Sequence, residues 1–268
     1  MLTTVITLKN ANFEGKGLPN LFPFTAKASL DFAYDFSVGS NRFIDISGNY
    51  TAPAEVYKND IAGGVITKKD SSGLVELPSG KGLRVEHGYV LLPVPTKAIK
   101  LADDEFTIMV KMAASSVAFP PSKKALATPT FASFMDLGSH VSTQGLSIDY
   151  RLDSNSVGAR INNAMLNLSD RTAINLGAPV ILFISYKAGI WTTYNSVSNI
   201  TTTKTNSELG LSGVTEIVTR PGTPKIVIGG SSNISSTLAA SFTDIYQAAR
   251  WNRKLTDSEI AQQLINSM

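Results

Sequence analysis

The ten residues WNRKLTDSEI, Trp251 to Ile260, mark a change of pattern near the end of the chain. Thr256 is a good helix N-cap, and the carboxylate of Glu259, three residues on, can reach back to the Thr256 amide, as in a capping box. The residues that follow give the helix one apolar face, made of Ile260, Leu264 and Ile265. This stretch predicts a strand that ends in an aromatic residue and a short helix that packs on the fold before it.

Upstream of Trp251, apolar and polar residues alternate with period two, which is typical of half-buried strands. The pattern is clearest in GLSIDYRLD, residues 145–153, whereas PVILFISYKAG, residues 179–189, is apolar on both faces and suits a central strand. Stretches rich in Pro, Gly, Ser and Thr separate the strands, and this favours an all-β sandwich or jelly roll. The side chains expected in its core are Phe106, Ile108, Val110, Leu146, Ile148, Tyr150, Leu182 and Ile184.

The 268 residues are 43% hydrophobic and 17% charged, which is typical of a globular chain, and the length suits one sandwich domain. The 24 basic and 21 acidic residues nearly balance, so the charge does not indicate a nucleic-acid partner. There is no cysteine, so packing and backbone hydrogen bonds must hold the fold. The opening residues lack the features of a secretory signal, and the longest apolar run, Val180 to Ile184, is too short to span a bilayer. We therefore expect neither general export nor a membrane partner.

Five stretches, in chain order, resemble laminin-G-like, concanavalin A-like jelly-roll domains. They are LDFAYDFSVGSNRFIDISGNYTAP, GLRVEHGYVLLPVP with LADDEFTIMVKM, FISYKAGIWTTYN, KIVIGGSS and the closing aromatic-Asn-Arg-x-Leu-Thr before the acidic helix start. The resemblance covers roughly residues 30–265. It implies a two-sheet antiparallel jelly-roll sandwich over residues 29–268, with a short C-terminal helix, and leaves residues 1–28 as an N-terminal arm.

The residues needed for catalysis are not spaced for it. The Glu-x-Asp-x-x-Glu signature of glycosidases on this scaffold is absent; Asp149 and Asp153 share a strand face, but Arg151 lies between them and suits an exposed charge ladder. There is no Gly-x-Ser-x-Gly motif. Of the two histidines, His87 is expected in the core and His140 in a turn, and neither has a second ligand at metal-binding spacing. We therefore expect that the protein is not an enzyme and that it has no catalytic residue, no metal site and no cofactor.

Two kinds of loop remain as candidate binding sites. Asp45 to Asn49 and Asp153 to Ser156 are rich in oxygen ligands and would suit a structural calcium ion, but turn chemistry explains the same residues equally well. GIWTTYN, residues 189–195, predicts a sugar-binding hairpin in which Trp191 and Tyr194 give an aromatic platform and Asn195 an amide. The alternative is that Trp191 only covers the sheet.

Residues 1–28 lie outside the family resemblance and contain an apolar cluster. This cluster predicts docking on another protein chain, and hence a homo-oligomer or an attached component, through Leu18, Leu21, Phe22 and Phe24. The alternative is an additional edge strand of the same sandwich.

The opening of the chain is also similar to the starts of small lectin-like structural proteins of tailed bacteriophages. That similarity implies a non-enzymatic virion protein, a capsid decoration or a tail or fibre component, made in the host cytoplasm and released by lysis. Its expected partners are other virion proteins and host surface glycans. A carbohydrate-active enzyme and a secreted carbohydrate-binding module are the alternatives.

Overall fold

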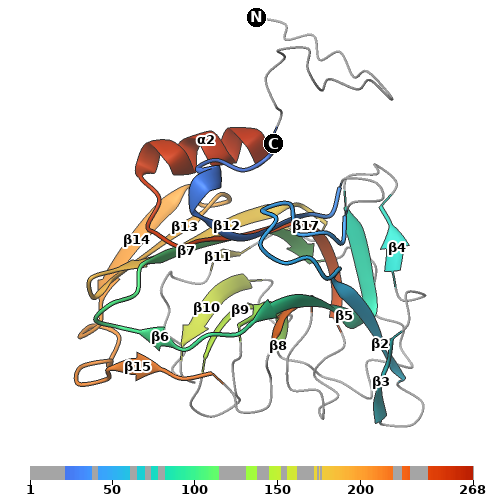
Figure 1. Cartoon of the computed structure of the whole chain (residues 1–268), viewed down its shortest axis with the longest axis horizontal. Helices are drawn as coiled ribbons and strands as arrows, with labels where there is room; N and C mark the ends of the chain where they lie inside the picture. Colours follow the sequence, from blue (N-terminus) through green and yellow to red (C-terminus); the bar gives the residue numbers. More distant parts are fainter. Residues whose placement is uncertain are drawn as a thin grey trace, which may run out of the picture.

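The computed structural model describes residues 22–37, 42–60, 65–69, 74–77, 82–114, 131–137, 145–151, 156–161, 172–173, 175, 177–219, 225–229 and 241–267. These residues form two layers of antiparallel strands, one C-terminal helix on the outer face of one layer, and a short 3-10 turn, η1 (Lys27–Ser29) (Figure 1). None of the helices in this described part is long and apolar enough to cross a membrane.

The layer under the helix has the strand order β14-β13-β12-β7-β17, and β1 also pairs with β17. Its strands are β1 (Leu30–Asp35), β7 (Phe106–Ala114), β12 (Val180–Lys187), β13 (Ile190–Asn195), β14 (Ile200–Thr205) and β17 (Ser241–Trp251). The central strand β12 pairs with both β7 and β13, in agreement with its apolar character on both faces.

The second layer continues from the first through β5 (Leu83–Pro95), which pairs with β17 over its first half and with β16 over its second half. Beyond β5 the order is β16-β8-β9-β10-β11, and β2 and β4 also pair with β5. These strands are β2 (Glu55–Asp60), β3 (Val65–Lys69), β4 (Leu74–Glu76), β8 (Phe131–Asp136), β9 (Leu146–Arg151), β10 (Ser156–Ile161), β11 (Thr172–Ala173) and β16 (Lys225–Ile228). A separate pair, β6 (Ile99–Lys100) and β15 (Glu216–Ile217), forms a small second sheet.

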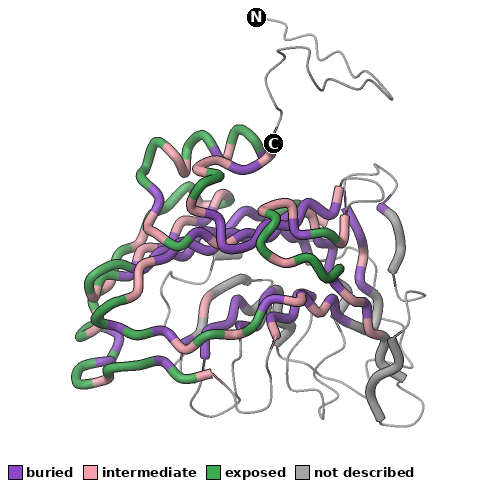
Figure 2. The backbone as a smooth tube through the Cα atoms, in the orientation of Figure 1, coloured by how far each residue is buried: buried purple, intermediate pink, exposed green. Residues whose placement is uncertain are grey.

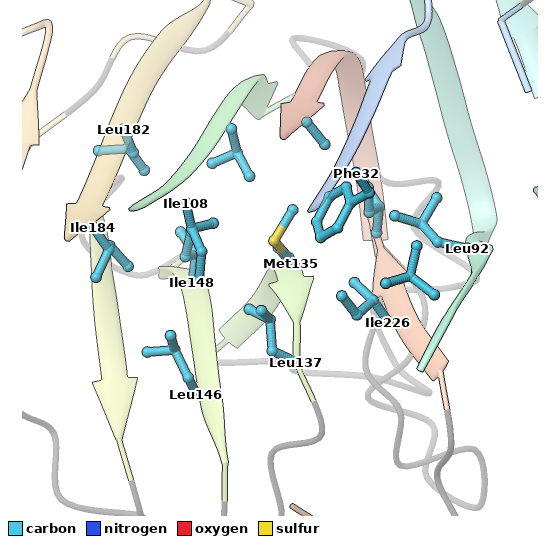
Figure 3. Close-up of a cluster of buried hydrophobic side chains, with 14 of the residues drawn as sticks. Phe32, Leu92, Ile108, Met135, Leu137, Leu146, Ile148, Leu182, Ile184 and Ile226 are labelled. Carbon is cyan, nitrogen blue, oxygen red and sulfur yellow. The ribbon is translucent and has the colours of Figure 1, made fainter. Parts of the chain in front are cut away.

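The main core lies between the two layers, and buried residues run along the strands of both (Figure 2). Period-two alternation predicts this arrangement, because it places every second side chain on the inner face. Side chains from both layers, such as Ile108 and Ile184 on one side and Met135 and Ile148 on the other, point toward one another (Figure 3). The all-β antiparallel sandwich is therefore confirmed, as is the burial of Phe106, Ile108, Val110, Leu146, Ile148, Leu182 and Ile184. The side chain of Tyr150 lies outside the described residues.

A second core lies on the outer face of the first layer, beneath α2 (Asp257–Ser267). The predicted capping box is present: the Glu259 amide donates to Thr256 Oγ1 at 3.3 Å and the Thr256 amide to Glu259 Oε2 at 2.9 Å. Ile260 and Leu264 pack on this core as expected. The prediction for Ile265 is wrong, because this side chain is 64% exposed.

Residues 22–26 complete the second core, and we refer to them as the strap. Phe24 is 3% exposed and packs edge-on against Trp251 and Phe22, with ring centroids 6.3 Å apart in both pairs. Gln263 of α2 holds the strap backbone, because its Oε1 accepts from the Thr25 amide at 2.8 Å and its Nε2 donates to the Pro23 carbonyl at 3.1 Å. The prediction that Phe24 contacts another chain is therefore corrected, because Phe24 is buried in its own sandwich. Phe22 packs beside it and is half-buried, so its contact with another chain stays a prediction. Leu18 and Leu21 lie outside the described residues.

Candidate functional site

The predicted sugar-binding residues lie on β13, which follows β12 through a two-residue turn. Ala188 and Gly189 both have positive φ, 48° and 80°, as a type I′ hairpin turn requires. Lys187 pairs with Ile190 across the turn, and this register sets which side of β13 each side chain takes. Period two then separates Trp191 and Asn195, which share the inner face, from Tyr194 on the outer face. The three side chains therefore do not form one site.

Trp191 is a core residue. Its side chain is fully buried between Tyr186 and Phe106, with ring centroids at 4.5 Å and 5.9 Å, and its Nε1 donates to Asn206 Oδ1 at 2.8 Å. No face of the indole is open to a sugar ring. The prediction of Trp191 as a binding platform is corrected, since the indole packs in the core.

Asn195 is also structural. It is 2% exposed, and its Oδ1 accepts from the Val197 amide at 2.9 Å, which closes the turn between β13 and β14. Asn residues often stabilise turns by such a local hydrogen bond. Asn195 is therefore corrected from a ligand-binding amide to a turn residue.

Tyr194 is the predicted residue that lies on the outer face, where it packs against the second core. It is half-buried, its ring packs beside Phe183 at 6.2 Å, and its hydroxyl donates to Asn199 Oδ1 at 3.0 Å. Thr201 of the neighbouring strand β14 pairs with Tyr194, and Thr203 pairs with Thr192, so four side chains share the outer face. Thr201 and Thr203 are exposed. We call this surface the Tyr194 face, made of Thr192, Tyr194, Asn199, Thr201 and Thr203.

A charged group borders the Tyr194 face where the last strand meets α2. Lys254 Nζ donates to Thr192 Oγ1 at 3.1 Å, and the Lys254 amide donates to Glu105 Oε1 at 2.7 Å. Lys187 Nζ lies 2.9 Å from the other oxygen of Glu105. The hydrogen bond from Lys187 is the main cause that lowers the pKa of the Glu105 carboxyl below its usual value. At neutral pH this border therefore carries two cations and one carboxylate around an otherwise uncharged surface.

Asn199 was not predicted from the sequence. It lies in the turn between β13 and β14 with a φ of 52°, a left-handed conformation that Asn adopts more readily than most residues. The polar residues from Ser196 to Asn199 indicate a turn in the sequence. Only the fold shows that the Asn199 amide accepts a hydrogen bond from the Tyr194 hydroxyl. Asn199 supplies the amide that the sequence assigned to Asn195.

The Asp45 loop, one of the two candidate calcium-binding loops, is a turn held together by hydrogen bonds to the Asp45 carboxylate. The Asp45 carboxylate accepts from the backbone amides of Ala33, Ser47, Asn49 and Tyr50 at 2.8 to 3.1 Å, and from the Ser47 hydroxyl at 2.6 Å. Both oxygens thus face hydrogen-bond donors, as expected of a turn that is tied to β1. Of the other loop, only Ser156 at the start of β10 is described.

The residues considered for catalysis are mostly outside the described part of the chain. Asp149 lies on β9 and His87 on β5, but their side chains are not described, and Asp153 and His140 fall outside the described residues. Among the residues that are described, no group of three or more His, Asp or Glu side chains is placed to hold a metal ion.

Comparison with known proteins identifies the class of fold. No protein-family model matches the sequence, and no curated protein matches it. Among solved structures, the chain is similar to domain 4 of AbnA, a GH43 extracellular arabinanase from Geobacillus stearothermophilus in complex with arabinotriose, with a TM-score of 0.53 and 12% identity over 88% of this chain and 98% of that domain.

Two further similarities involve parts of longer chains. A mutant Trypanosoma rangeli sialidase displaying trans-sialidase activity matches with a TM-score of 0.53 and 12% identity over 90% of this chain and 34% of that one. The Botulinum neurotoxin serotype D ligand binding domain in complex with N-acetylneuraminic acid matches with a TM-score of 0.53 and 10% identity over 90% of this chain and 51% of that one. At these identities the similarities show a shared β-sandwich fold. The chain spans about a third of the sialidase and half of the toxin domain.

Proposed function

We propose that this chain is a non-enzymatic carbohydrate-binding module that contacts oligosaccharides through the Tyr194 face. The observation that carries the proposal is a half-buried tyrosine that is hydrogen-bonded to an amide and lies beside two exposed threonines, on the outer face of β13 and β14. The arabinanase domain, which matches this chain over nearly its whole length, was solved with an arabinose trisaccharide.

The chemistry of the Tyr194 face suits a neutral sugar chain. A tyrosine ring combines a large apolar surface with a polar tip, so it can pack on the C–H face of a sugar and still form hydrogen bonds. The Thr201 and Thr203 hydroxyls can donate and accept, as can the Asn199 amide. The Tyr194 face belongs to two adjacent strands and is extended, so we expect it to bind along several sugar units.

We also propose a more specific role, that of a virion structural protein. A virion structural protein that displays a glycan-binding sandwich would agree with the opening residues, which are similar to those of bacteriophage lectin-like proteins. In that role its partners are other virion proteins and a host surface glycan, and it acts on the particle after lysis. Detection of the chain in purified particles is the direct test of this part.

Calorimetric titration of the full chain with arabinotriose, beside a glycan panel that includes N-acetylneuraminic acid, tests the binding function. We expect binding of at least one oligosaccharide, weakened about tenfold or more by Tyr194→Ala, because the ring supplies most of the apolar contact. Tyr57→Ala is the matched control: Tyr57 is half-exposed, stacks on Tyr89 and lies on another strand. Release of new reducing ends from a bound glycan would refute the non-enzymatic role. Equal binding by Tyr194→Ala would refute this face.

A further inference from the structure

A small cavity with a buried cation lies at the end of the sandwich where the two-stranded sheet β6–β15 is located. Its walls are mostly apolar and come from both layers and from β6 and β15. Its polar lining consists of Thr96, Lys97, Thr219 and Arg250. Apolar cavities with a few convergent polar groups are the usual form of small-molecule sites.

Arg250 occupies an inward position on β17, opposite Ile108 of β7. Its side chain is 11% exposed, and its guanidinium lies over the Phe106 ring, 5.2 Å from the centroid. Stacking of this kind holds the plane of a guanidinium and leaves its N–H groups available at the edge. Nε is fully buried and donates no hydrogen bond to any residue that the structure describes. A buried donor of this type is costly unless it is satisfied.

Asp31 compensates the charge of Arg250 but does not satisfy its N–H group. The distance from Arg250 Nε to Asp31 Oδ2 is 3.7 Å, which is too long for a hydrogen bond. Asp31 lies at a register shift between β1 and β17, and its Oδ1 accepts from the Tyr50 hydroxyl at 3.2 Å. Lys97 Nζ lies 3.7 Å from the same oxygen. The Asp31 carboxylate is thus shared among three partners.

Two cations line the cavity, and two carboxylates act on Arg250. Arg250 and Lys97 supply two cations and Asp31 one anion, while Asp104 adds a weaker attraction to Arg250. Burial is the main cause that lowers the pKa of Arg250, although a guanidinium remains protonated at neutral pH. The Lys97 side chain is 53% exposed, so it can turn from Asp31 toward a ligand at the cavity mouth.

We propose that this cavity binds the carboxylate of an acidic sugar, held between the Arg250 guanidinium and Lys97. The free space is about 10 Å³, which admits one group of the size of a water molecule. One oxygen therefore enters while the sugar ring stays at the mouth, beside the Thr96 and Thr219 hydroxyls. Two cations line the cavity, and a charge-assisted hydrogen bond to a guanidinium is stronger than a neutral one. This site is separate from the Tyr194 face and does not depend on it.

Proton–nitrogen NMR spectra of the full chain can follow the Arg250 Nε–H signal, assigned by its loss in Arg250→Lys. Sodium D-glucuronate is the probe, titrated at constant ionic strength, with D-glucose, sodium acetate and sodium chloride as comparisons. We expect a saturable shift of the signal with glucuronate, a much weaker effect of acetate, and none with glucose. Lys97→Gln should weaken glucuronate binding about threefold to tenfold. Lys100→Gln, an exposed lysine that does not line the cavity, is the matched control and should bind as the unmodified chain does.

Each other outcome overturns the proposal. Absence of a saturable shift with glucuronate, or glucuronate binding by Lys97→Gln equal to that of the Lys100→Gln control, removes the carboxylate site. An equal response to acetate shows that the sugar ring contributes nothing, and an equal response to chloride shows an adventitious ion only. Oligosaccharide binding by Lys97→Gln, measured by calorimetry as for the Tyr194 face, shows whether the proposed glycan function stands independently of this result.

Discussion

At the scale of single residues, Glu259 links the last strand to α2. Its carboxylate accepts from the Thr256 amide at 2.9 Å and pairs with both terminal nitrogens of Arg253. The hydrogen bond from Arg253 is the main cause that lowers the pKa of Glu259, to about 2. The Glu259 side chain therefore caps α2 and also holds the loop that leads into the helix, through Arg253.

The low pKa of Glu259 predicts a pH-dependent contribution to stability. Because the carboxyl binds its proton more weakly in the folded state, the stabilisation is fully present above the unfolded pKa of about 4.3 and is lost as the pH falls toward 2. Glu259→Gln should lower the free energy of unfolding by about 1 kcal/mol at pH 7, since the ion pair is partly exposed and screened. Urea unfolding of both proteins at pH 7, 4 and 2.5 measures it. A difference that stays constant over this range would contradict the prediction.

At the scale of elements, the strap and α2 stabilise each other on the outer face of the first layer. Trp251 Nε1 donates to the Thr25 carbonyl at 2.8 Å, and Gln263 contacts the strap backbone on both sides of Phe24. Gln263 is fully buried, although a glutamine in a helix is usually exposed. The buried side-chain amide of Gln263 is satisfied because it forms hydrogen bonds with the backbone of Pro23 and Thr25, much as one strand does with its neighbour.

Phe24→Ala should lower the free energy of unfolding by about 3 kcal/mol, because it leaves a cavity beside Trp251. Chemical denaturation measures this, and Ile265→Ala, on the exposed side of the same helix, is the control that should change stability by less than about 0.5 kcal/mol. A chain that starts at residue 25 should likewise be less stable than one that starts at residue 22. Equal stability of the two truncated chains would mean that the strap docks without contributing.

At the scale of the whole molecule, the main core joins both layers into one unit. Ile148 of β9 and Ile184 of β12 come from opposite layers and belong to the same buried cluster. Because one core is shared by both layers, we expect the two layers to unfold in a single transition.

Ile148→Ala should lower the free energy of unfolding by about 2–5 kcal/mol, because the side chain is 1% exposed within that core. Differential scanning calorimetry should show one transition, shifted to lower temperature. Val197→Ala, at a 47% exposed turn position, serves as the control and should leave the transition nearly unchanged. Two separate transitions, only one of them moved by Ile148→Ala, would contradict a shared core.

Features that depend on neighbouring residues could be predicted from the sequence. Period-two alternation predicts the strands and the buried partners on each of them, and the Thr256–Glu259 spacing predicts the helix start, because both patterns act within a few residues. The covering of the inner face of β13 depends on how the layers pack, and this packing buries Trp191 and Asn195 and leaves Tyr194 half-buried on the outer face. It also brought Arg250 to Asp31 and Gln263 to the strap, across more than 200 residues in each case. Such contacts depend on how the layers and the helix pack, and local periodicity carries no information about the partner across that distance.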